Sequence, residues 1–539
     1  MASDLDSATH LHDVLIVGAG PCGLAVASRL SEHMPAASFT DDEHNRKIWH
    51  WMQRGKGKMS YKARKTGDVT PADSCSRRAK GNLPDIVVLD ATADKWMARW
   101  DTLFKTFDIS HLRSPMFFHF DPAERDGLLS YTHMNGRERE LREIRGCVGK
   151  ELSKHQRKMR ERGRREPGGQ PTIDERDRND YFVPSTPLFA SHCGCIIDRY
   201  HLRDDIVRQG KVVDITFDYY DAVCETDKVF RVQTDNQVYF SRTAVLAVGP
   251  ANEATIPATP GVDNPIAMTH AMKIKEFPSQ QIQAKIEAKR TTNIVVVGGG
   301  LTSAQLADLA LRRGVTRVWL IMRGPLKVKP FDVGLEWVGK FRNFEQAAFW
   351  TADSDSERWE KIKAARNGGS ITPPYKKILD QHINKGKVIL SLHTTIKTKA
   401  WDEKSQTWDI ELSGGHPQKL PPIDHIYFAT GVQSNFETLP YIQSLQAQYP
   451  VSNCGGLPCI TEDMQWSDEV PLFLAGRLGG LQLGPGAPNL VGARIGAERI
   501  SWAIEDILSE QKDEKSPDQG AQHDYLTARG SRYEALAEE

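Results

Sequence analysis

Two segments of the chain repeat one local pattern, a short apolar run that leads directly into a glycine-rich turn and then into a helix. DVLIV at 13–17 runs into GAGPCG at 18–23, and NIVVV at 293–297 runs into GGG at 298–300. Such runs are typical of parallel strands buried on both faces. A glycine turn at a helix N-terminus offers backbone N–H donors and a positive dipole end to an anion such as a pyrophosphate. The pattern predicts an α/β fold with two Rossmann-like dinucleotide-binding domains.

The first turn has the features of a dinucleotide fingerprint. Gly18 allows the tight turn, Gly20 lets a pyrophosphate approach the backbone, and Gly23 lets the helix pack closely on the strand. An acidic residue about 20 positions further on should hold the ribose hydroxyls. The stretch SFTDDEH supplies Asp41 and Asp42 after a predicted second strand, and the sequence does not decide between them.

The second turn departs from this fingerprint in two ways. Gly298 and Gly300 keep the pattern, but Ser303 stands where the third glycine belongs, and it is small enough for close helix packing. The strand predicted at 317–321 is followed by Arg323 and not by an acid. Because an arginine can hold a 2'-phosphate that an acid would repel, the second site favours NADP over NAD. The alternative is an ordinary surface arginine.

Strand-like segments between and after the two units indicate that one dinucleotide domain is inserted in the other. We expect the outer domain to comprise residues 1–250 and 420–508, and the inner domain to comprise 285–415. Segments rich in Pro, Gly and polar residues mark the boundaries.

The first part of the outer domain is expected to carry a charged insertion, and a tail is expected to follow the second part. An insertion near 130–180 is densely charged from Arg137 to Arg165. It is predicted to be a solvated surface helix or, alternatively, a contact surface for a negatively charged partner. The tail at 509–539 lacks apolar periodicity and is predicted to be disordered.

The composition limits the partners of the chain. Its 539 residues include 70 Lys plus Arg and 70 Asp plus Glu, a balance that argues against nucleic acid or an anionic membrane as the main partner. No apolar run approaches the ~18 residues needed to span a bilayer, and the acidic start is unlike a signal peptide. We therefore expect a cytoplasmic protein. The eight cysteines form no zinc-binding pattern, so no metal is expected.

Several motifs together resemble the two-dinucleotide-binding flavoproteins: DVLIVGAGPCGLAVA, LAVGP, VVVGGGLTSAQLA, FATGV and PLFLAGRLGGLQLGPGAPNLVGARIGAERI. Within that superfamily the chain is most similar to the class B flavin monooxygenases, notably the lysine and ornithine N-hydroxylases and the related oxidative-stress-induced growth inhibitor proteins. The resemblance covers roughly residues 13–504. It implies FAD at the first turn, NADPH at the second, and oxygen that adds at flavin C4a before transfer to a small amine or amino acid. The implied partners are a small-molecule substrate and molecular oxygen.

The cysteines separate this chain from the disulfide reductases of the same superfamily. Those enzymes carry a C-x4-C pair just after the first nucleotide unit, where this chain has WHWMQRGKGKM. Cys454 and Cys459 have that spacing but lie near the C-terminus. A flavin-coupled disulfide is therefore not expected.

A histidine between the two domains is the candidate catalytic residue. In class B monooxygenases a Pro-Gly pair precedes F-x-G-x-x-x-H at the hinge between the domains. Here Pro260 and Gly261 precede His270 at that separation, but Asn264 and Ile266 replace the Phe and Gly. The resemblance implies a hinge role for His270, and the alternative is a structural histidine.

The C-terminal motif supplies further cofactor contacts. Reductases of the superfamily have AGD where this chain has Ala followed by Gly476 and Arg477. Arg477 is predicted to pair with a phosphate or a substrate carboxylate, or to be structural. A helix that starts near Asn489 and Leu490 would offer N–H groups to the negative charge of a reduced flavin.

Substrate contacts are predicted in HLRSPMFFHFDP at 111–122, which would lie near the flavin if the segment folds as in the relatives. Arg113 and His119 are the predicted contacts to a carboxylate, and core packing is the alternative for the aromatic residues. Two other functions stay open. One is a flavin reductase with an acceptor other than oxygen, and the other is a flavin-bearing redox regulatory or interaction protein.

Overall fold

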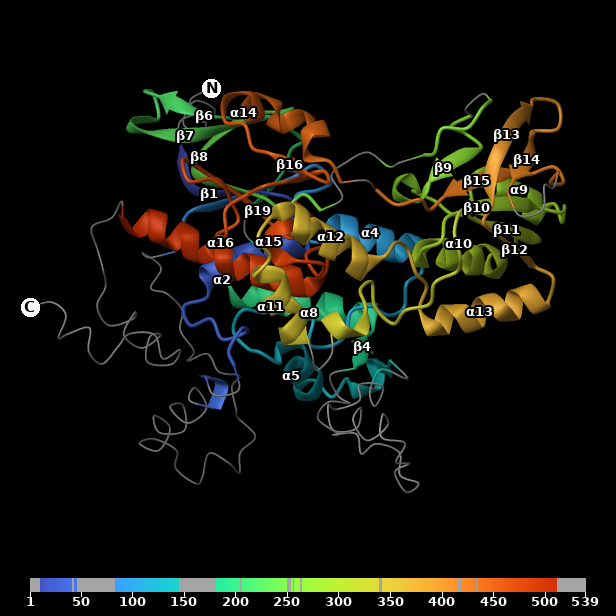
Figure 1. Cartoon of the computed structure of the whole chain (residues 1–539), viewed down its shortest axis with the longest axis horizontal. Helices are drawn as coiled ribbons and strands as arrows, with labels where there is room; N and C mark the ends of the chain where they lie inside the picture. Colours follow the sequence, from blue (N-terminus) through green and yellow to red (C-terminus); the bar gives the residue numbers. More distant parts are fainter. Residues whose placement is uncertain are drawn as a thin grey trace, which may run out of the picture.

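The computed structural model describes residues 10–40, 43–45, 83–144, 147, 181–203, 206–249, 254, 256–261, 264–338, 342–414, 419–432 and 434–510. Asp41 and Asp42, most of the charged insertion, and the tail after residue 510 lie outside these ranges. None of the described helices is both long and apolar enough to cross a membrane. The described residues form two lobes, each built on its own sheet (Figure 1).

The first lobe contains an eight-stranded sheet in the order β18-β19-β8-β1-β2-β5, to which β7 and then β6 are added through β8. Strands β19, β8, β1, β2 and β5 are parallel, so their carboxyl ends share one edge. In the central strand β1, Val14, Leu15 and Ile16 are fully buried, as its unbroken apolar run predicts. The bounds are β1 Leu11–Val17, β2 Ile86–Asp90, β5 Val207–Gln209, β6 Val212–Tyr220, β7 Cys224–Thr234, β8 Val238–Leu246, β18 Gln465–Ser467 and β19 Val470–Leu474.

The second lobe contains a five-stranded parallel sheet in the order β12-β11-β10-β15-β9. All of its strands lie between β8 and β18 in the sequence. The sheet extends beyond the range 285–415 expected for the inner domain, because β9 and β15 belong to it. The bounds are β9 Met268–His270, β10 Asn293–Val297, β11 Arg317–Met322, β12 Val388–Leu392 and β15 His425–Phe428.

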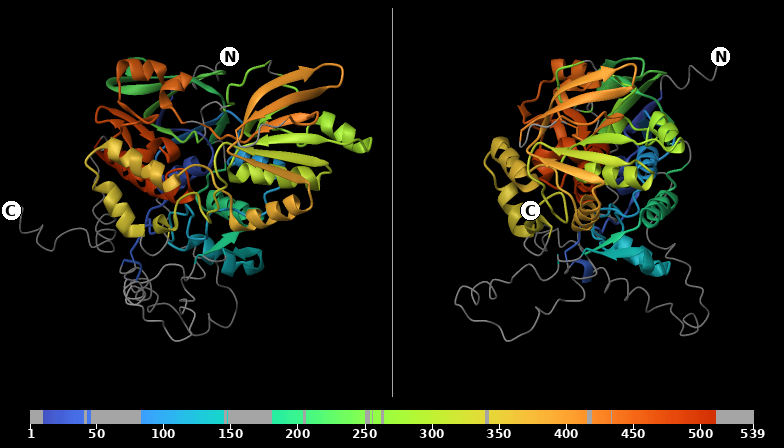
Figure 2. Two further views of the ribbon diagram at one scale, coloured as in Figure 1. Left: turned by 45° about the vertical axis from the view of Figure 1, so that its right-hand side comes forward. Right: turned by 90° about the vertical axis from the view of Figure 1, so that its right-hand side faces the viewer.

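The central strand β10 of the second sheet is buried on both faces. Ile294 and Val296 pack with the helices α9, α10 and α13, whereas Val295 packs with Trp408 of the hairpin β13–β14. Figure 2 shows the hairpin and the helices on opposite faces. The bounds are α9 Gln280–Glu287, α10 Leu301–Arg312, α13 Pro373–Asn384, β13 Thr395–Asp402 and β14 Thr407–Ser413.

Helix α2 (Pro21–Ser31) follows β1 directly and carries the first glycine turn at its N-terminus, with Pro21 at the first helical position. The long helix α16 (Leu490–Glu510) packs along α2. The other helices of this lobe are α4 Ala98–Thr106, α5 Gly127–Met134, α8 Thr186–Arg199, α14 Gln443–Gln448 and α15 Gly480–Leu483. Short two-stranded ladders join β3 (Leu141–Glu143) to β4 (Phe182–Pro184) and β16 (Asn453–Cys454) to β17 (Leu457–Pro458).

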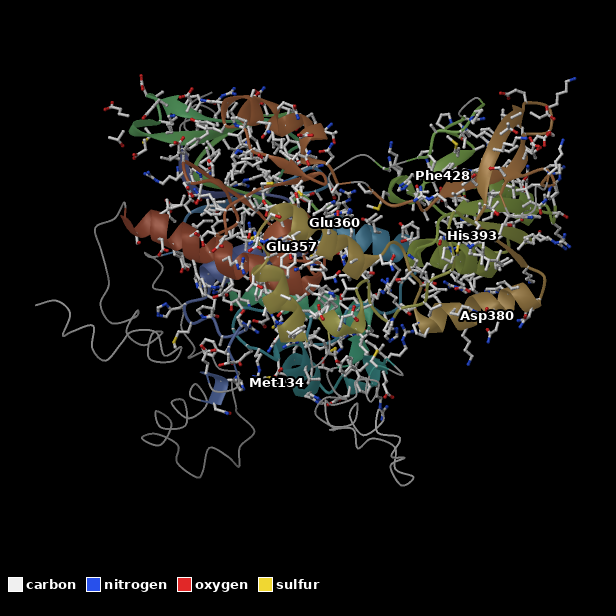
Figure 3. The ribbon with its side chains drawn as sticks, viewed as in Figure 1. Met134, Glu357, Glu360, Asp380, His393 and Phe428 are labelled. Atoms are coloured by element: carbon white, nitrogen blue, oxygen red, sulfur yellow. The ribbon has the colours of Figure 1, made fainter. Side chains whose placement is uncertain are left out.

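Two helices between β11 and β12 leave the second lobe and lie on the first. We call α11 (Arg342–Trp350) and α12 (Asp355–Arg366) the helical excursion. In Figure 3, Glu357 and Glu360 of α12 lie over the first lobe, whereas Asp380 and His393 stay in the second. The indole Nε1–H of Trp350 donates to the carbonyl of Gln482, 3.1 Å away, so the excursion is bonded to the first lobe.

A buried ion pair fixes α2 against α16. The Arg29 side chain is 3% exposed, and its Nε lies 2.8 Å from Glu498 Oε2 and its guanidinium 3.2 Å from Glu505 Oε1. Two carboxylates on α16 therefore neutralise one cation on the helix that carries the first glycine turn.

Replacing Arg29 with Met should destabilise the first lobe by about 3–5 kcal/mol, because Glu498 would stay buried without its partner. Chemical unfolding followed by circular dichroism measures the change. The control is Arg312→Met, since Arg312 is 45% exposed in its pairs with Asp108 and Asp308 and should cost no more than about 1 kcal/mol. Equal costs for the two variants would contradict the role of burial.

Candidate functional site

The first glycine turn lies at the carboxyl end of β1 and is closed by the neighbouring strand β8. Gly18 has φ 112°, and a Cβ added there would lie 2.5 Å from the carbonyl oxygen of Ala247. A Cβ on Gly23 would lie 2.0 Å from the carbonyl oxygen of Gly18, so the helix packs tightly on the turn. In contrast, a Cβ on Gly20 would meet nothing within 4 Å. This combination of tight packing and open space is what a bound pyrophosphate needs.

The C-terminal motif reaches the same place through β19. The Ala475 N–H donates to the carbonyl of Leu246, 3.0 Å away, at the end of β8. Gly476 has φ 67°, and a Cβ on it would lie 2.8 Å from the sulfur of Cys22 in the first turn of α2. Burial raises the pKa of Cys22 to about 11, so this thiol is neutral. Segments far apart in sequence thus meet at the N-terminus of α2.

The strand beside β1 ends in an acidic residue, Asp90, which the expected spacing of about 20 residues does not indicate. Asp90 closes β2, and its Oδ2 accepts the N–H of Ala19 in the glycine turn at 2.9 Å. Its Oδ1 accepts the N–H of Thr92 at 2.7 Å. A carboxylate has about four acceptor sites, so Asp90 can still accept bonds from a ribose. Its position at the strand end is the one expected for the ribose acid.

The prediction of a second strand just before Asp41 and Asp42 is wrong, because residues 36–40 contain a turn at 37–38 and no strand. Asp41 and Asp42 themselves lie outside the described residues. The sequence IVVLD at 86–90 has the pattern expected of the second strand, an apolar run that ends in an acidic residue. A long insertion separates this run from α2, so the expected spacing of about 20 residues indicated Asp41 and Asp42 and not Asp90.

The second glycine turn repeats the first at the carboxyl end of β10. Gly298 has φ 150°, and a Cβ on it would lie 2.4 Å from the carbonyl oxygen of Ala429, which follows β15. A Cβ on Gly300 would meet nothing within 4 Å. Ser303 is fully buried, and its hydroxyl donates to the Gly300 carbonyl at 2.6 Å. The serine thus takes the third glycine's place with its polar atom bonded.

Basic side chains lie at the carboxyl edge of the second sheet. Arg323 directly follows β11 and is exposed. Further along the same loop, the ammonium of Lys327 donates to both side chain and backbone oxygens of Asn367. The segment beyond Asn367 touches the second turn, because a Cβ on Gly369 would lie 3.1 Å from the Gly300 backbone. Two basic residues, Arg323 and Lys327, thus lie on the loop that follows β11.

Arg477 connects the two turns. Its guanidinium donates to the carbonyl of Val432 at 3.2 Å, and Val432 pairs with Ala254 in a bridge between the two chain crossings that join the lobes. Burial lowers the pKa of Arg477, and the nearby Arg366 lowers it further. Among the described residues no carboxylate pairs with Arg477. The guanidinium is thus a partly buried cation with no carboxylate partner among the described residues, bonded to the chain segment that follows β15.

His270 ends the edge strand β9 and pairs in register with Phe428 of β15. Only 1% of the residue is exposed, and its Nδ1 accepts the N–H of Met272 at 3.2 Å. Burial lowers its pKa, which favours the neutral ring. The histidine lies at the same edge of the second sheet as the second turn, with β15 between them, and its catalytic role stays a prediction.

Helix α16 begins where the sequence predicts a helix start. The first bond within the helix runs from the Ala493 N–H to the Asn489 carbonyl, 3.0 Å long, so the N–H groups of Leu490 to Gly492 precede the helical ladder. A Cβ on Gly492 would lie 2.5 Å from Ala487 Cα, which shows how closely the preceding loop folds over this end.

The helical excursion covers that loop. Phe349 is buried, and a Cβ on Gly484 would lie 3.5 Å from its ring. The Arg366 guanidinium donates to the carbonyl of Pro485 at 3.0 Å. Residues contributed by the second lobe therefore enclose the start of α16, where the sequence predicts contacts to a flavin.

The two predicted substrate residues have other partners in this conformation. The guanidinium of Arg113 donates to the carbonyls of Lys329, Pro330 and Phe331 and pairs with Asp332. It thus fastens the predicted substrate segment of the first lobe to a loop of the second.

His119 is fully buried. Its Nε2–H donates to the carbonyl of Arg125 at 2.7 Å, and its Nδ1 accepts the N–H of Asp121 at 3.2 Å. Burial lowers its pKa to about 3, so the ring is neutral near pH 7. A carboxylate contact at Arg113 and His119 stays a prediction that this arrangement does not favour.

The described cysteines are all free thiols. The sulfur of Cys454 donates to the carbonyl of Asp355 at 3.4 Å. Burial raises the pKa of Cys459 to about 12, which leaves that thiol protonated and unreactive.

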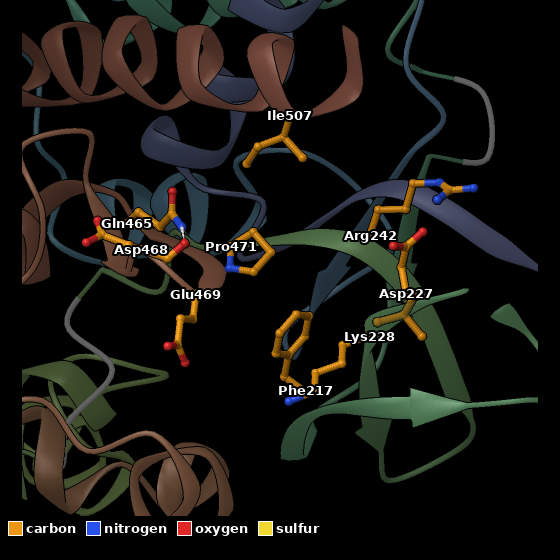
Figure 4. Close-up of a pocket in the computed structure, with 10 residues that line it drawn as sticks. Phe217, Asp227, Lys228, Arg242, Gln465, Asp468, Glu469, Pro471 and Ile507 are labelled. Atoms are coloured by element: carbon orange, nitrogen blue, oxygen red, sulfur yellow. Dashed lines mark hydrogen bonds between the residues drawn. The ribbon is translucent and has the colours of Figure 1, made fainter. Parts of the chain in front are cut away.

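A surface pocket of about 370 Å³ lies at the amino-terminal edge of the first sheet, opposite to the glycine turns (Figure 4). It is lined by side chains of both charges and by apolar ones, among them Phe217, Asp227, Lys228, Arg242, Asp468 and Ile507. The parallel strands separate this pocket from the two turns, so it is not part of the candidate site.

No family model and no curated protein sequence matches the chain. Solved structures do match it over nearly the whole length. An ornithine hydroxylase from Pseudomonas aeruginosa is 16% identical, with 93% of this chain and 100% of that chain covered and a TM-score of 0.57. An ornithine N-hydroxylase from Kutzneria sp. 744, described with reduced FAD, NADP+ and L-ornithine, is 14% identical, with 93% and 100% covered and a TM-score of 0.58.

An L-lysine 6-monooxygenase from Pseudomonas syringae is 17% identical, with 92% of this chain and 99% of that chain covered and a TM-score of 0.55. The resemblance inferred from the glycine motifs is thus confirmed for the fold. The chain has the two-dinucleotide-binding fold of the N-hydroxylating flavin monooxygenases.

Proposed function

We propose that the chain is an FAD- and NADPH-dependent monooxygenase that hydroxylates the nitrogen of a small amine or amino acid. The observation that carries the proposal is the pair of equivalent glycine turns, each with open space over its middle glycine, Gly20 or Gly300. Arg477 and the bridge between Val432 and Ala254 link the chain crossings between the two lobes. The fold shared with ornithine and lysine hydroxylases supports the same reading.

The residues at the first turn fit FAD. The backbone of the turn and the N-terminus of α2 would hold the pyrophosphate, and Asp90 would accept the ribose hydroxyls. Gly476 and the free N–H groups around Leu490 would face the flavin end. When bound, FAD supplies the redox chemistry, because it takes a hydride from NADPH and lets an oxygen atom of O2 pass to the substrate.

The residues at the second turn fit NADPH. Gly298, Gly300 and Ser303 would hold its pyrophosphate, and Arg323 would read the 2'-phosphate. His270, buried at the same edge of the second sheet, would position the domain hinge or the nicotinamide end of the cofactor.

The chain itself has to place the amine and exclude water. The helical excursion encloses the loop before α16 through Phe349 and Arg366, and this enclosure would keep water from the reacting oxygen. An amine reacts only when it is neutral, so no strong acid or base is required of the protein beyond orienting the nitrogen. Arg477 has no carboxylate partner among the described residues and could hold an anionic group of substrate or cofactor.

The reaction class can be tested by following NADPH oxidation, oxygen uptake and hydrogen peroxide release together. A cognate amine should accelerate the first two and suppress peroxide release, with rates that rise with pH as the ammonium loses its proton. NADPH oxidation that ignores oxygen and needs an added acceptor would point to a flavin reductase instead. Bound flavin with no NADPH oxidation would favour a regulatory role.

The two turns can be tested with matched variants. Gly20→Val should yield a folded but colourless protein, because the new side chain fits the fold and fills the space of the pyrophosphate. Gly300→Val should stay yellow with FAD but lose NADPH binding, for the same reason at the second turn. Visible absorption and NADPH titration separate the outcomes. If Gly20→Val kept its flavin, FAD would not lie at the first turn.

Arg323→Ala should raise the Michaelis constant for NADPH by roughly 10- to 100-fold and leave that for NADH nearly unchanged, since a bond to a charged phosphate contributes about 1.5–3 kcal/mol. Arg317→Ala is the control, because Arg317 is exposed at the opposite end of β11. An equal effect of Arg323→Ala on both cofactors would remove Arg323 from the phosphate site.

A further inference from the structure

Three side chains that bind metals well meet at the amino-terminal edge of the first sheet. His10 precedes β1, His12 is the second residue of β1, and Asp85 directly precedes β2. The glycine turn and Asp90 lie at the carboxyl ends of these same strands. The cluster is therefore on the far side of the sheet from the candidate cofactor sites and is not used by the proposed reaction.

The two imidazoles converge on one carboxylate oxygen. His10 Nε2 lies 2.7 Å and His12 Nδ1 2.8 Å from Asp85 Oδ2. The ligand atoms of all three residues lie within 4.8 Å of one another. The spacing H-x-H explains the convergence, because residues two apart on an extended chain point to the same side.

The backbone around the cluster holds Asp85 in place. The N–H of Asp85 donates to Asp13 Oδ2 at 2.9 Å, and its carbonyl accepts the N–H of Val14 at 3.0 Å. Asp13 in turn lies 3.7 Å from the guanidinium of Arg242 on β8. The carboxylate thus sits on a backbone fixed by two strands, whereas His10 is more than half exposed and free to adjust.

We propose that His10, His12 and Asp85 form a binding site for a borderline divalent cation such as Zn2+. Two imidazoles and one carboxylate are a ligand set that zinc uses, with a water in the fourth position. Bonds of about 2.0–2.1 Å in a tetrahedron place ligand atoms roughly 3.3 Å apart. Each imidazole would move away from Asp85 by about half an ångström, and the proton that it now donates to the carboxylate would shift to its other ring nitrogen.

A cation here would join the start of β1 to the start of β2. Those two strands carry the first glycine turn and Asp90 at their other ends. Because only the folded chain brings the three ligands together, the cation would bind the folded state and stabilise the first sheet. The cation would act on stability and would not take part in the flavin chemistry.

A single histidine–carboxylate pair elsewhere on the surface provides a matched comparison. His133 Nδ1 lies 2.9 Å from Glu138 Oε1, at a length like those in the cluster, and both side chains are about half exposed. Without a second imidazole this pair lacks the ligand set, so His133→Gln is the control variant.

The test is equilibrium dialysis of the chelator-treated, full-length, FAD-loaded protein against Zn2+, with metal and flavin contents and the melting temperature measured on the same samples. The wild type and His133→Gln should bind one Zn2+ with equal affinity and melt at a higher temperature with metal. His10→Gln and Asp85→Asn should weaken binding by roughly 100-fold or more, since even residues that only support a ligand affect affinity by 10- to 100-fold.

His10→Gln keeps the proposal testable if other variants fold poorly, because His10 is exposed and lies ahead of the strand. Its flavin content and metal-free melting temperature should equal those of the wild type. Wild type that binds no Zn2+, or binding that His10→Gln and Asp85→Asn leave unchanged, would overturn the site. The readout does not depend on flavin activity, so it is independent of the proposed function.

Discussion

A single backbone contact, made once in each lobe, sets the geometry of both candidate sites. The turn after the central strand lies so close to the carbonyl of the neighbouring strand that only a glycine fits, at Gly18 beside Ala247 and at Gly298 beside Ala429. Because the strands are parallel, these contacts lie at the carboxyl edge, where helix N-termini also point. In both turns the next glycine but one, Gly20 or Gly300, has open space where a Cβ would lie.

The lobes are not joined by the linkers alone. Arg113 of the first lobe is bonded to the loop at 329–332 of the second lobe. The helical excursion of the second lobe in turn contacts the loop before α16 of the first. These contacts run in opposite directions between the same two bodies. The proposed hydride transfer between two dinucleotides would require a defined distance, and reciprocal contacts of this kind restrict how far the lobes can separate.

The parts of the fold predicted from the sequence are those that depend on local pattern. DVLIV and NIVVV form central strands because a run buried on both faces needs no alternation, and the glycines follow because their backbone has no room for a side chain. Asp90 could not be predicted in this way. It ends a strand that pairs with β1 across a long insertion, so the usual spacing of about 20 residues does not reach it. The second sheet extends beyond 285–415 for the same reason, since β9 joins it only through pairing with β15.

Ser303 shows how far a local rule can be relaxed. At the first turn a Cβ on Gly23 would lie 2.0 Å from the Gly18 carbonyl, which excludes any larger residue without a shift of the helix. At the second turn the equivalent position carries a buried serine whose hydroxyl is bonded to Gly300, so α10 must sit farther from its turn than α2 does from its own. A turn with that extra room still presents its N–H groups, because the contact at Gly298 and not the third glycine places the backbone. The close contact between the first glycine and the neighbouring strand is therefore kept in both turns of this chain. The close packing of the helix on the turn differs between them.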